Sequence, residues 1–374
     1  MHVAVMGRSI RPRASGVGRH VGNLVDGLAE VLPPRSLTVF LTRDAPCGLN
    51  GRVREIRAPF PTPNEYARAF WEQTVVPLQA ANLGIDVYHS PNYILPAALS
   101  RPAVVTIHDL TYLRSQLHRM TSHVYLSVLT ALAVRRATAV IAVSEYTRRC
   151  IEARYPHAAG RVEVIYQGMD PGLRCPSDAE VRAFQQRIDV TYPYLLFVGT
   201  LEPRKNLVRL VAAFEALIQA TGSPHHLVLI GAKGWKTATL DAAIAASPFR
   251  ERIHHRGYVP DQDLPFWYAG AAAFVYPSLE EGFGLPPLEA MALGAPVVTS
   301  NRTALPEVVG DAALTVDPTD VKALANALGS ILADSALAER LRQAGRCRAA
   351  GFSWSEAARR HVALYQRITS GGRR

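Results

Sequence analysis

Two carboxylates stand eight residues apart in the segment 278–290, which reads Ser-Leu-Glu-Glu-Gly-Phe-Gly-Leu-Pro-Pro-Leu-Glu-Ala. The segment follows an apolar run that predicts a strand, and its two prolines suit the first turn of a helix, where a missing N–H costs little. Gly282 and Gly284 let the backbone approach a ligand, and the N–H groups at a helix start suit an anion such as phosphate. Glu281 and Glu289 then suit hydroxyl groups, of a sugar at one end and of a ribose at the other. The alternative is an ordinary strand–loop–helix connection with solvated glutamates.

Two adjacent cations, Arg204 and Lys205, occupy a second loop of the same kind, Gly199–Asn206. This loop also follows an apolar strand and precedes a helix. Two cations at a strand end suit a diphosphate, whose charge they would stabilise as it departs from a sugar. A solvated surface pair is the alternative. The functional interpretation gains weight because both loops follow strands of the same half of the chain.

The first half of the chain offers two further signals. His108 ends the apolar run Val104–His108, and we expect it to donate a hydrogen bond to a substrate hydroxyl or, alternatively, to be structural. The glycine loop Ser15–Arg19 leads into a predicted helix and so resembles an anion site. It lacks the full Gly-x-Gly-x-x-Gly pattern, so dinucleotide binding is not supported.

The four cysteines are scattered, with no Cys-x-x-Cys pair and no metal spacing (Cys47, Cys150, Cys175 and Cys347). This argues against a disulfide framework and a zinc site, and it favours a reducing cytoplasm. The sequence also has no Walker lysine motif, no Gly-x-Ser-x-Gly elbow and no His-Glu-x-x-His motif.

Short β-branched runs alternate with amphipathic stretches along the chain, which indicates an α/β architecture of parallel sheets with helices on both faces. In the first half the expected strands are Val3–Gly7, Leu37–Leu41, Val87–His89, Val104–His108, Ala139–Val143 and Val162–Ile165, and the expected helices are Gly18–Val31 and Tyr66–Leu83. A connector over 166–193 leads to the expected strands Tyr194–Val198, His226–Ile230, Ile253–His255, Ala273–Tyr276, Val297–Thr299 and Leu314–Val316, with helices at Val208–Ala220, Leu240–Ala246, Leu264–Ala269, Pro287–Leu293 and Val321–Leu332. Two doubly wound halves facing a central cleft would bind ligands beyond the carboxyl ends of their strands.

The charge of the chain is unevenly placed. Its 374 residues, enough for two domains, carry 41 basic and 31 acidic side chains, a net charge of +10. Residues 1–187 hold 22 arginines, no lysine and 14 acidic residues, so this half alone carries +8. A basic half suits an anionic partner, and an Arg-rich codon bias is the alternative explanation.

Taken together, these segments resemble the retaining family-4 glycosyltransferases of the GT-B fold, and the resemblance runs over nearly the whole chain. Glu281–Glu289 is similar to that family's E-x7-E signature, and Gly199–Asn206 to its diphosphate loop. The acceptor-half landmarks of bacterial mannosyl- or rhamnosyl-transferring members resemble the segments 71–77, 88–92, 106–109 and 143–147. The fold implied is two Rossmann-like domains, residues 1–175 completed by a C-terminal helix 356–374, and residues 190–355. Trp354 would anchor that helix by packing.

The resemblance also implies roles for individual residues. Lys205 and Arg204 would bind the donor diphosphate, and Glu281 would hold the donor sugar near its C3 hydroxyl. Glu289 would accept hydrogen bonds from the ribose, and His108 would contact the donor sugar. The catalytic set is thus Glu281, His108, Lys205 and Arg204; the donor-binding set is Gly199, Thr200, Tyr258, Val259, Gly282, Phe283, Gly284, Leu285 and Glu289; and the acceptor or diphosphate side of the other half is Gly16, Val17, Gly18, Arg19 and Asp109. Many relatives have Arg where this chain has Thr200, which leaves the second phosphate cation open.

The activity implied is transfer of a hexose, mannose or a related deoxyhexose, from a nucleotide-diphosphate sugar to a glycan or polyprenyl-diphosphate-linked glycan in cell-surface polysaccharide synthesis. A GDP-linked donor is favoured, with no metal and no cofactor. A nucleotide-sugar epimerase of the same fold and a non-catalytic nucleotide-sugar-binding protein are the alternatives. Nucleic acid is disfavoured as a partner, because the basic residues are not interleaved with aromatic ones.

We expect a cytoplasmic protein that attaches peripherally to the inner face of the membrane through its basic half. The arginine-rich clusters that would meet anionic headgroups are Arg52, Arg54, Arg57 and Arg68, and Arg114, His118 and Arg119. A solvated arginine-rich surface is the alternative.

Overall fold

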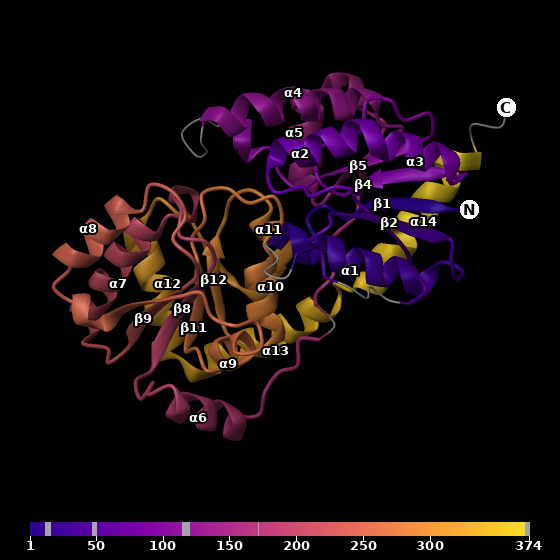
Figure 1. Ribbon diagram of the computed structural model, residues 1–374. Coiled ribbons are helices and arrows are strands. Elements are labelled where there is room, and N and C mark those ends of the chain that lie inside the picture. The colour runs from indigo at the N-terminus through magenta and orange to yellow at the C-terminus, as the bar shows by residue number, and fades with distance from the viewer. Residues whose placement is uncertain (12–15, 47–50, 114–119, 171, 371–374) are drawn as a thin grey trace. The chain divides into compact units, whose positions relative to one another are not determined.

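The computed structural model describes residues 1–11, 16–46, 51–113, 120–170 and 172–370, apart from the side chains of residue 65 and residues 120–125. The chain divides into two compact units, Met1–Asp170 with Phe352–Arg374, and Pro171–Gly351. The ranges expected from the sequence were 1–175 with 356–374, and 190–355. Each unit is an α/β domain with its own parallel sheet (Figure 1).

The sheet of the first unit has the strand order β3-β2-β1-β4-β5-β6-β7 within the described residues. Its strands are β1 (Val3–Met6), β2 (Leu37–Leu41), β3 (Arg54–Arg57), β4 (Val87–Ser90), β5 (Ala103–Ile107), β6 (Ala139–Ala142) and β7 (Val162–Val164). Its helices are α1 (Gly16–Val31), α2 (Glu65–Phe70), α3 (Val76–Asn82), α4 (Met120–Arg136), α5 (Glu145–Arg154) and α14 (Trp354–Ser370). All strand pairs are parallel; Val5 of β1, for example, lies between Val39 and His89.

Alternate side chains of this sheet enter two separate cores, because successive residues of a strand point to opposite faces. Val3 and Val5 belong to the core that includes Leu24 of α1. Ala4 and Met6 belong to the other core, on the opposite face. Both faces are therefore covered, as the unbroken apolar strands predict.

The sheet of the second unit has the order β10-β9-β8-β11-β12-β13 within the described residues, again with parallel pairs. Its strands are β8 (Tyr194–Val198), β9 (His226–Ile230), β10 (Ile253–Gly257), β11 (Ala273–Tyr276), β12 (Val297–Ser300) and β13 (Leu314–Val316). Its helices are α6 (Asp178–Arg187), α7 (Leu207–Thr221), α8 (Ala238–Ala246), α9 (Leu264–Ala269), α10 (Leu285–Ala292), α11 (Leu305–Val309), α12 (Val321–Ala333) and α13 (Ser335–Ala350). The strand order reverses between β8 and β11, and such a switch point is where open α/β sheets bind ligands.

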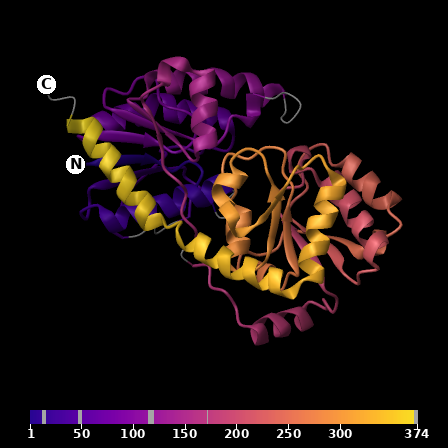
Figure 2. The same cartoon turned by 180° about the vertical axis from the view of Figure 1, so that it is seen from behind.

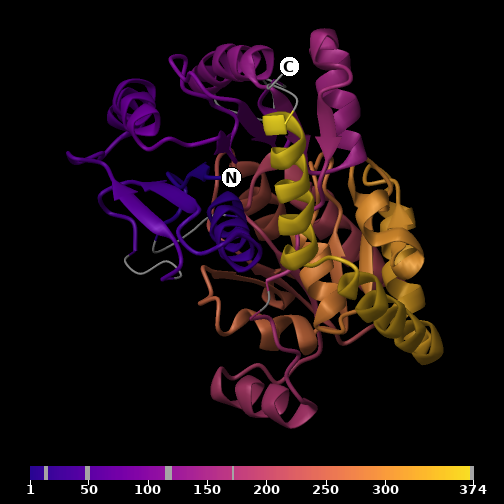
Figure 3. The same ribbon diagram turned by 90° about the vertical axis from the view of Figure 1, so that its right-hand side faces the viewer.

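The C-terminal helix α14 belongs to the first unit, as expected. It packs lengthwise against α1 (Figures 2 and 3). Trp354 at its start is only 6% exposed and joins the core that contains Val3 and Val5, which confirms its packing role.

The elements differ from the expected ones in several places: α4, α5, α11 and α13 were not among the expected helices, and three further differences have an identifiable cause. The connector 166–193 contains α6, which begins with a capping box between Ser177 and Glu180; the Ser-x-x-Glu pattern carried this signal. Strand β3 was missed because its Arg-Glu-Ile-Arg sequence lies at the sheet edge and is partly exposed. The single helix expected over 66–83 is broken by a π-helical turn at Trp71–Val75, which ends two residues before Pro77, a residue that cannot donate a helical hydrogen bond.

Across the described ranges, no single helix is long and apolar enough to cross a membrane. Helices α12 and α13 pass that test only as a pair, bent by 100°.

Candidate active site

The two loops singled out in the sequence lie side by side at the carboxyl ends of neighbouring strands. The loop 199–206 follows β8 and the loop 277–284 follows β11, and these strands pair directly. The backbone N–H of Leu279 donates to the carbonyl of Arg204 at 2.8 Å, and the side-chain amide of Asn206 donates to the carbonyl of Pro277 at 3.1 Å. Segments more than 70 residues apart therefore form one hydrogen-bonded platform.

Arg204, Lys205 and Glu281 meet on this platform. Nζ of Lys205 lies 2.5 Å from Oε1 of Glu281, and Nη1 of Arg204 lies 2.8 Å from Oε2 of the same carboxylate. Glu202 approaches Arg204 from the other side, with Oε1 2.5 Å from Nε. Lys205 and Glu281 are buried, while Arg204 stays partly exposed. Three of the four predicted catalytic residues are thus in direct contact.

The two cations keep Glu281 ionised. Burial acts to raise its pKa, but the charges of Arg204 and Lys205 and their hydrogen bonds outweigh this and hold the pKa at about 2. Burial also lowers the pKa of Lys205, and Glu281 opposes that shift. An ionised carboxylate accepts hydrogen bonds only, so Glu281 suits the hydroxyls of a sugar.

Tyr276, the last residue of β11, supports Lys205 and was not predicted from the sequence. The Nζ of Lys205 donates to its hydroxyl and lies 4.7 Å from the centre of its ring. Burial raises the pKa of Tyr276 well above its usual value, so the phenol stays neutral. The signal in the sequence was the position of Tyr276, at the carboxyl end of a strand that enters the site.

Glu289 lies in α10, buried, and accepts a hydrogen bond of 3.0 Å from the hydroxyl of Tyr268 in α9. Gly282, Phe283 and Gly284 form the turn before α10, which Leu285 opens. Pro286 and Pro287 have no N–H, so the amides that face the start of α10 come from the turn itself.

Three glycines extend the platform across the ends of β8, β9 and β10. The N–H of Gly199 donates to the carbonyl of Ile230 at 2.9 Å, and that of Gly231 donates to the carbonyl of Gly257 at 2.8 Å. Gly231 has a φ of +141°, and a Cβ there would lie 2.0 Å from the carbonyl oxygen of Gly199. The backbone can pass this closely only without side chains. Gly231 was missed because single glycines after strands are common.

Two residues of the predicted donor-binding set, Tyr258 and Val259, lie at the β10 end of this row. Tyr258 is 61% exposed, and Val259 follows it. Thr200 lies at the other end, after Gly199. Within the described part of the chain, no hydrogen bond or ion pair joins Tyr258 or Val259 to Arg204, Lys205 or Glu281.

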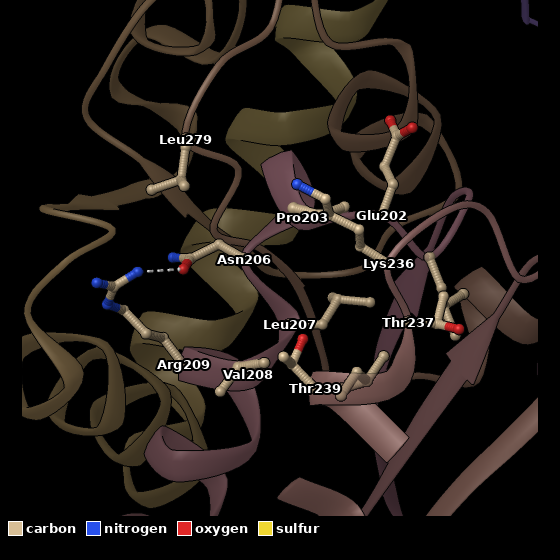
Figure 4. A pocket seen from close by; sticks show the side chains of 12 residues that line it. Glu202, Pro203, Asn206, Leu207, Val208, Arg209, Lys236, Thr237, Thr239 and Leu279 are labelled. Atoms are coloured by element: carbon tan, nitrogen blue, oxygen red, sulfur yellow. Dashed lines mark hydrogen bonds between the residues drawn. The ribbon is translucent and has the colours of Figure 1, made fainter. Parts of the chain in front are cut away.

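A pocket of about 160 Å³ opens behind the turn that carries Arg204 and Lys205, between the starts of α7 and α8 (Figure 4). Arg209 at its rim donates to the side-chain oxygen of Asn206 at 2.9 Å. Of the described residues, Glu202, which pairs with Arg204, lines this pocket. Lys205 and Glu281 do not line it. The pocket therefore adjoins the platform without containing its charged centre.

The fourth predicted catalytic residue, His108, lies in the other unit, just after β5, and is 7% exposed. Its Nε2 lies 2.9 Å from the carbonyl oxygen of Pro91, so this nitrogen carries the proton and donates. Burial lowers the pKa of His108, which leaves the ring neutral and Nδ1 without a proton. His108 is therefore set to accept a hydrogen bond from a hydroxyl, whereas the sequence suggested that it donates one.

Both the carboxylate and the backbone N–H of Asp109 form hydrogen bonds with neighbouring residues of the first unit. Its Oδ1 accepts hydrogen bonds from the N–H and the hydroxyl of Thr111 at 3.1 and 2.8 Å, and its own N–H donates to the hydroxyl of Tyr93 at 3.2 Å. These contacts order the loop after β5.

The glycine loop of the first unit opens α1, where the first turn holds Gly16, Val17, Gly18 and Arg19. Ser15 of that loop lies outside the described residues. His20, one residue further, packs edge-on against His108 with ring centres 4.6 Å apart, so the start of α1 and the end of β5 meet.

The basic clusters expected to face a membrane are only partly exposed. Arg52 and Arg54 are exposed, and Arg57 is half-buried and donates to the carbonyl of Pro46 at 3.0 Å. Arg68 is only 7% exposed and cannot meet a headgroup, because α2 turns it inward. The other cluster, Arg114, His118 and Arg119, lies outside the described residues. Within the ranges described, no group of His, Cys, Asp or Glu is arranged to hold a metal ion.

Comparisons with known proteins show the family of the chain. Residues 178–348 match the family described as Glycosyl transferases group 1, and residues 14–173 match Glycosyltransferase Family 4. The chain is 36% identical over 282 residues to O-antigen chain mannosyltransferase B of Escherichia coli, covering 75% of this chain and 74% of the relative.

Two solved structures share the fold over almost the full length of the chain. The sucrose-phosphate synthase of Thermosynechococcus elongatus superposes with a TM-score of 0.80 at 23% identity, covering 99% of this chain and 100% of the other. HepE of Anabaena, in complex with UDP and glucose, superposes with a TM-score of 0.74 at 18% identity, covering 98% and 99%.

Proposed function

Because this chain belongs to glycosyltransferase family 4, we propose that it transfers mannose, or a related deoxyhexose, from a GDP-linked donor to a glycan, with retention of the anomeric configuration. The observation that carries the proposal is the ionised Glu281 held between Arg204 and Lys205 where β8 and β11 end. One cluster there offers cations for a diphosphate and an acceptor for sugar hydroxyls.

The donor diphosphate would bind Arg204 and Lys205. In the structure both cations pair with Glu281, and a carboxylate oxygen can accept more than one hydrogen bond. A diphosphate can therefore approach the exposed edge of Arg204 while Glu281 still accepts from the sugar. Stabilising the charge that develops on the departing diphosphate is the main contribution such a site makes to the rate.

The nucleoside would lie along the row formed by Gly199, Gly231 and Gly257, towards Tyr258. Glu289 would accept from the ribose hydroxyls while Tyr268 holds its carboxylate in place. The choice of guanine rests on the resemblance of the loop Gly199–Asn206, and the choice of mannose on the relative named as a mannosyltransferase. HepE binds UDP, so uridine-linked donors must be tested alongside guanosine-linked ones.

For the chemical step we propose attack from the side of the leaving group. The bond from C1 to the diphosphate oxygen breaks, the bond from C1 to the acceptor oxygen forms, and the acceptor proton passes to the diphosphate. His108 would accept from a donor-sugar hydroxyl through Nδ1 and so orient the ring. Trapping a glycosyl group covalently on Glu281 or Asp109 would overturn this route.

The experiment that tests the function is a donor screen with GDP-, UDP- and dTDP-linked hexoses, read as thermal stabilisation and nucleotide release. A ligand that binds the native state raises its melting temperature, so we expect GDP-mannose or a GDP-deoxyhexose to stand out. Incubation with the donor alone distinguishes the alternatives, since slow hydrolysis fits a transferase whereas an epimerised nucleotide sugar fits an epimerase. The anomeric configuration of the product, read by NMR, tests retention.

The acceptor proposed is a glycan, free or linked to a polyprenyl diphosphate, met at the membrane surface through the first unit. Arg52 and Arg54 are exposed there, as are Tyr66 and Phe70, one helical turn apart on α2. Basic and aromatic side chains together suit an anionic interface. We expect the R52Q/R54Q variant to sediment less with anionic vesicles, while R250Q/R340Q, two exposed arginines of the other unit, sediments like wild type. Equal sedimentation of all three proteins would refute the membrane contact.

A further inference from the structure

His108 is enclosed by aromatic rings on two sides. The ring of His20 stands perpendicular to it, with centres 4.6 Å apart and an interplanar angle of 89°. The ring of Tyr93 approaches at 5.9 Å and 62°. Together with the 2.9 Å hydrogen bond to the carbonyl of Pro91, these contacts define one orientation of the imidazole.

His20 is a buried histidine at the start of α1. It is 3% exposed, and the buried side chain of Gln167 is the polar group that faces its ring and acts to raise its pKa. Two rings also contact it: that of His108 and that of Trp354, the latter at 5.1 Å and 69°.

Trp354 is itself fixed by the backbone around it. A Cβ on Gly168 would lie 2.2 Å from the N of Trp354, and a Cβ on Gly27 would lie 3.1 Å from its carbonyl oxygen. Directly beside it, the N–H of Met169 donates to the carbonyl of Phe352 at 3.0 Å. The backbone at the start of α14 is therefore closely packed, and His20 contacts both the indole of Trp354 and the ring of His108.

We propose that His20, backed by Trp354, is a positioning residue that holds the His108 imidazole with Nε2 on Pro91 and Nδ1 available to a substrate hydroxyl. Rotation of the ring by half a turn about its Cβ–Cγ bond would exchange Nδ1 with a carbon and break the bond to Pro91. The perpendicular contact opposes that rotation, because the turning ring would strike His20. This inference rests on the proposed role of His108 in contacting the donor sugar.

The electrostatics are consistent with this role. Burial lowers the pKa of His20 well below its usual value, and the neighbouring His108 lowers it further. A neutral His20 adds no positive charge beside His108, whose own pKa is lowered by burial. Both rings stay neutral at pH 7, and the lone pair on Nδ1 of His108 is preserved.

The test compares His20→Ala, which removes the ring, with His20→Phe, which keeps a ring of similar shape. Trp354→Leu removes the indole ring that packs against His20. His361→Phe is the matched control, since His361 is a buried histidine of α14 that packs against His89 and Tyr365. The readouts are kcat and KM for the donor, the melting temperature, and the 15N signals of His108, assigned with His108→Asn.

We expect His20→Ala and Trp354→Leu to lower kcat about 10- to 100-fold with little change in donor KM, as misplacement of a reacting group does. The 15N signals of His108 should lose the pattern of a single Nε2–H tautomer in both variants. His20→Phe should keep kcat and the 15N pattern of His108 close to those of wild type. His361→Phe should lower the melting temperature without changing kcat or the 15N pattern.

Unchanged kcat and an unchanged His108 tautomer in His20→Ala would overturn the proposal, as would equal damage in His20→Phe and His20→Ala. The 15N measurement needs no substrate. If wild type transfers no sugar, the proposed function fails while the positioning of His108 is still tested.

Discussion

The Nζ of Lys205 lies 2.5 Å from Oε1 of Glu281, although the two residues are 76 positions apart in the chain and both are buried. This ion pair couples the strand ends β8 and β11, so the same contact bears on stability and on the proposed catalysis.

Replacing Glu281 by Gln should therefore lower both the stability of the fold and the rate of sugar transfer. The variant keeps the shape of the side chain but leaves the buried Lys205 without its counter-charge, and breaking a buried pair costs about 3–5 kcal/mol. We expect the free energy of unfolding, measured with urea, to fall by that order and sugar transfer to drop by about 100-fold or more. Glu339→Gln, which removes an exposed ion pair with Arg342, should change stability by less than about 1 kcal/mol. Equal urea midpoints for the two variants would contradict the assignment.

We expect Glu289 to bind the ribose of the donor nucleotide, and its replacement should change how strongly ribose hydroxyls contribute to nucleotide affinity. If its carboxylate accepts from ribose hydroxyls, wild type should bind GDP more tightly than its 2′,3′-dideoxy analogue, by about 10-fold for the lost hydrogen bonds to a charged group. In Glu289→Ala this preference should vanish, while Tyr268→Phe, which removes only the 3.0 Å support, should keep most of it. Calorimetric titration of the three proteins with both nucleotides measures this, and a preference that survives in Glu289→Ala places the ribose elsewhere.

The buried histidines of the first unit should make the protein sensitive to acid. Burial lowers the pKa of His361 to about 4 and also lowers the pKa values of His20 and His89. The unfolded chain takes up these protons near pH 6.5 and the folded chain does not, so stability is full above that pH and is lost as the pH falls towards 4. His361 alone accounts for about 3 kcal/mol.

Urea unfolding between pH 7.5 and 4.5 measures this loss. His361→Phe should show a smaller decrease than wild type, whereas His157→Gln, at an exposed histidine, should show the same decrease. A loss of stability that is identical in wild type and His361→Phe would exclude His361 as a contributor.

Gly231 should not tolerate a side chain. An alanine Cβ would lie 2.0 Å from the carbonyl oxygen of Gly199, and its φ of +141° is unfavourable for any L-residue. We expect Gly231→Ala to lower the melting temperature and to abolish most of the thermal stabilisation by the donor nucleotide. Gly22→Ala, in α1 with open space around it, should instead be neutral or stabilising by up to about 1 kcal/mol. Normal nucleotide binding by a folded Gly231→Ala would show that the row of glycines is not the nucleotide platform.

The buried parts of the fold were predictable from local sequence. Leu37–Leu41 and Tyr194–Val198 were predicted with the boundaries that the structure shows, because central strands of parallel sheets are unbroken apolar runs. The edge strand Arg54–Arg57 was not, since a strand with one open side needs no such run. The break at Trp71–Val75 was missed because the chain is helical on both sides of this single π-helical turn.

The sequence by itself determined the alternation of strands and helices, the family, and the residue types at the strand ends. Only the tertiary structure decided that Arg204 and Lys205 meet Glu281, that Nε2 of His108 donates to Pro91 and leaves Nδ1 without a proton, that Arg68 points inward and that His20 contacts both His108 and Trp354. The reason is physical. Local sequence sets which conformation a segment adopts, whereas contacts between residues far apart in the chain, and the pKa values that follow from them, depend on how those segments pack.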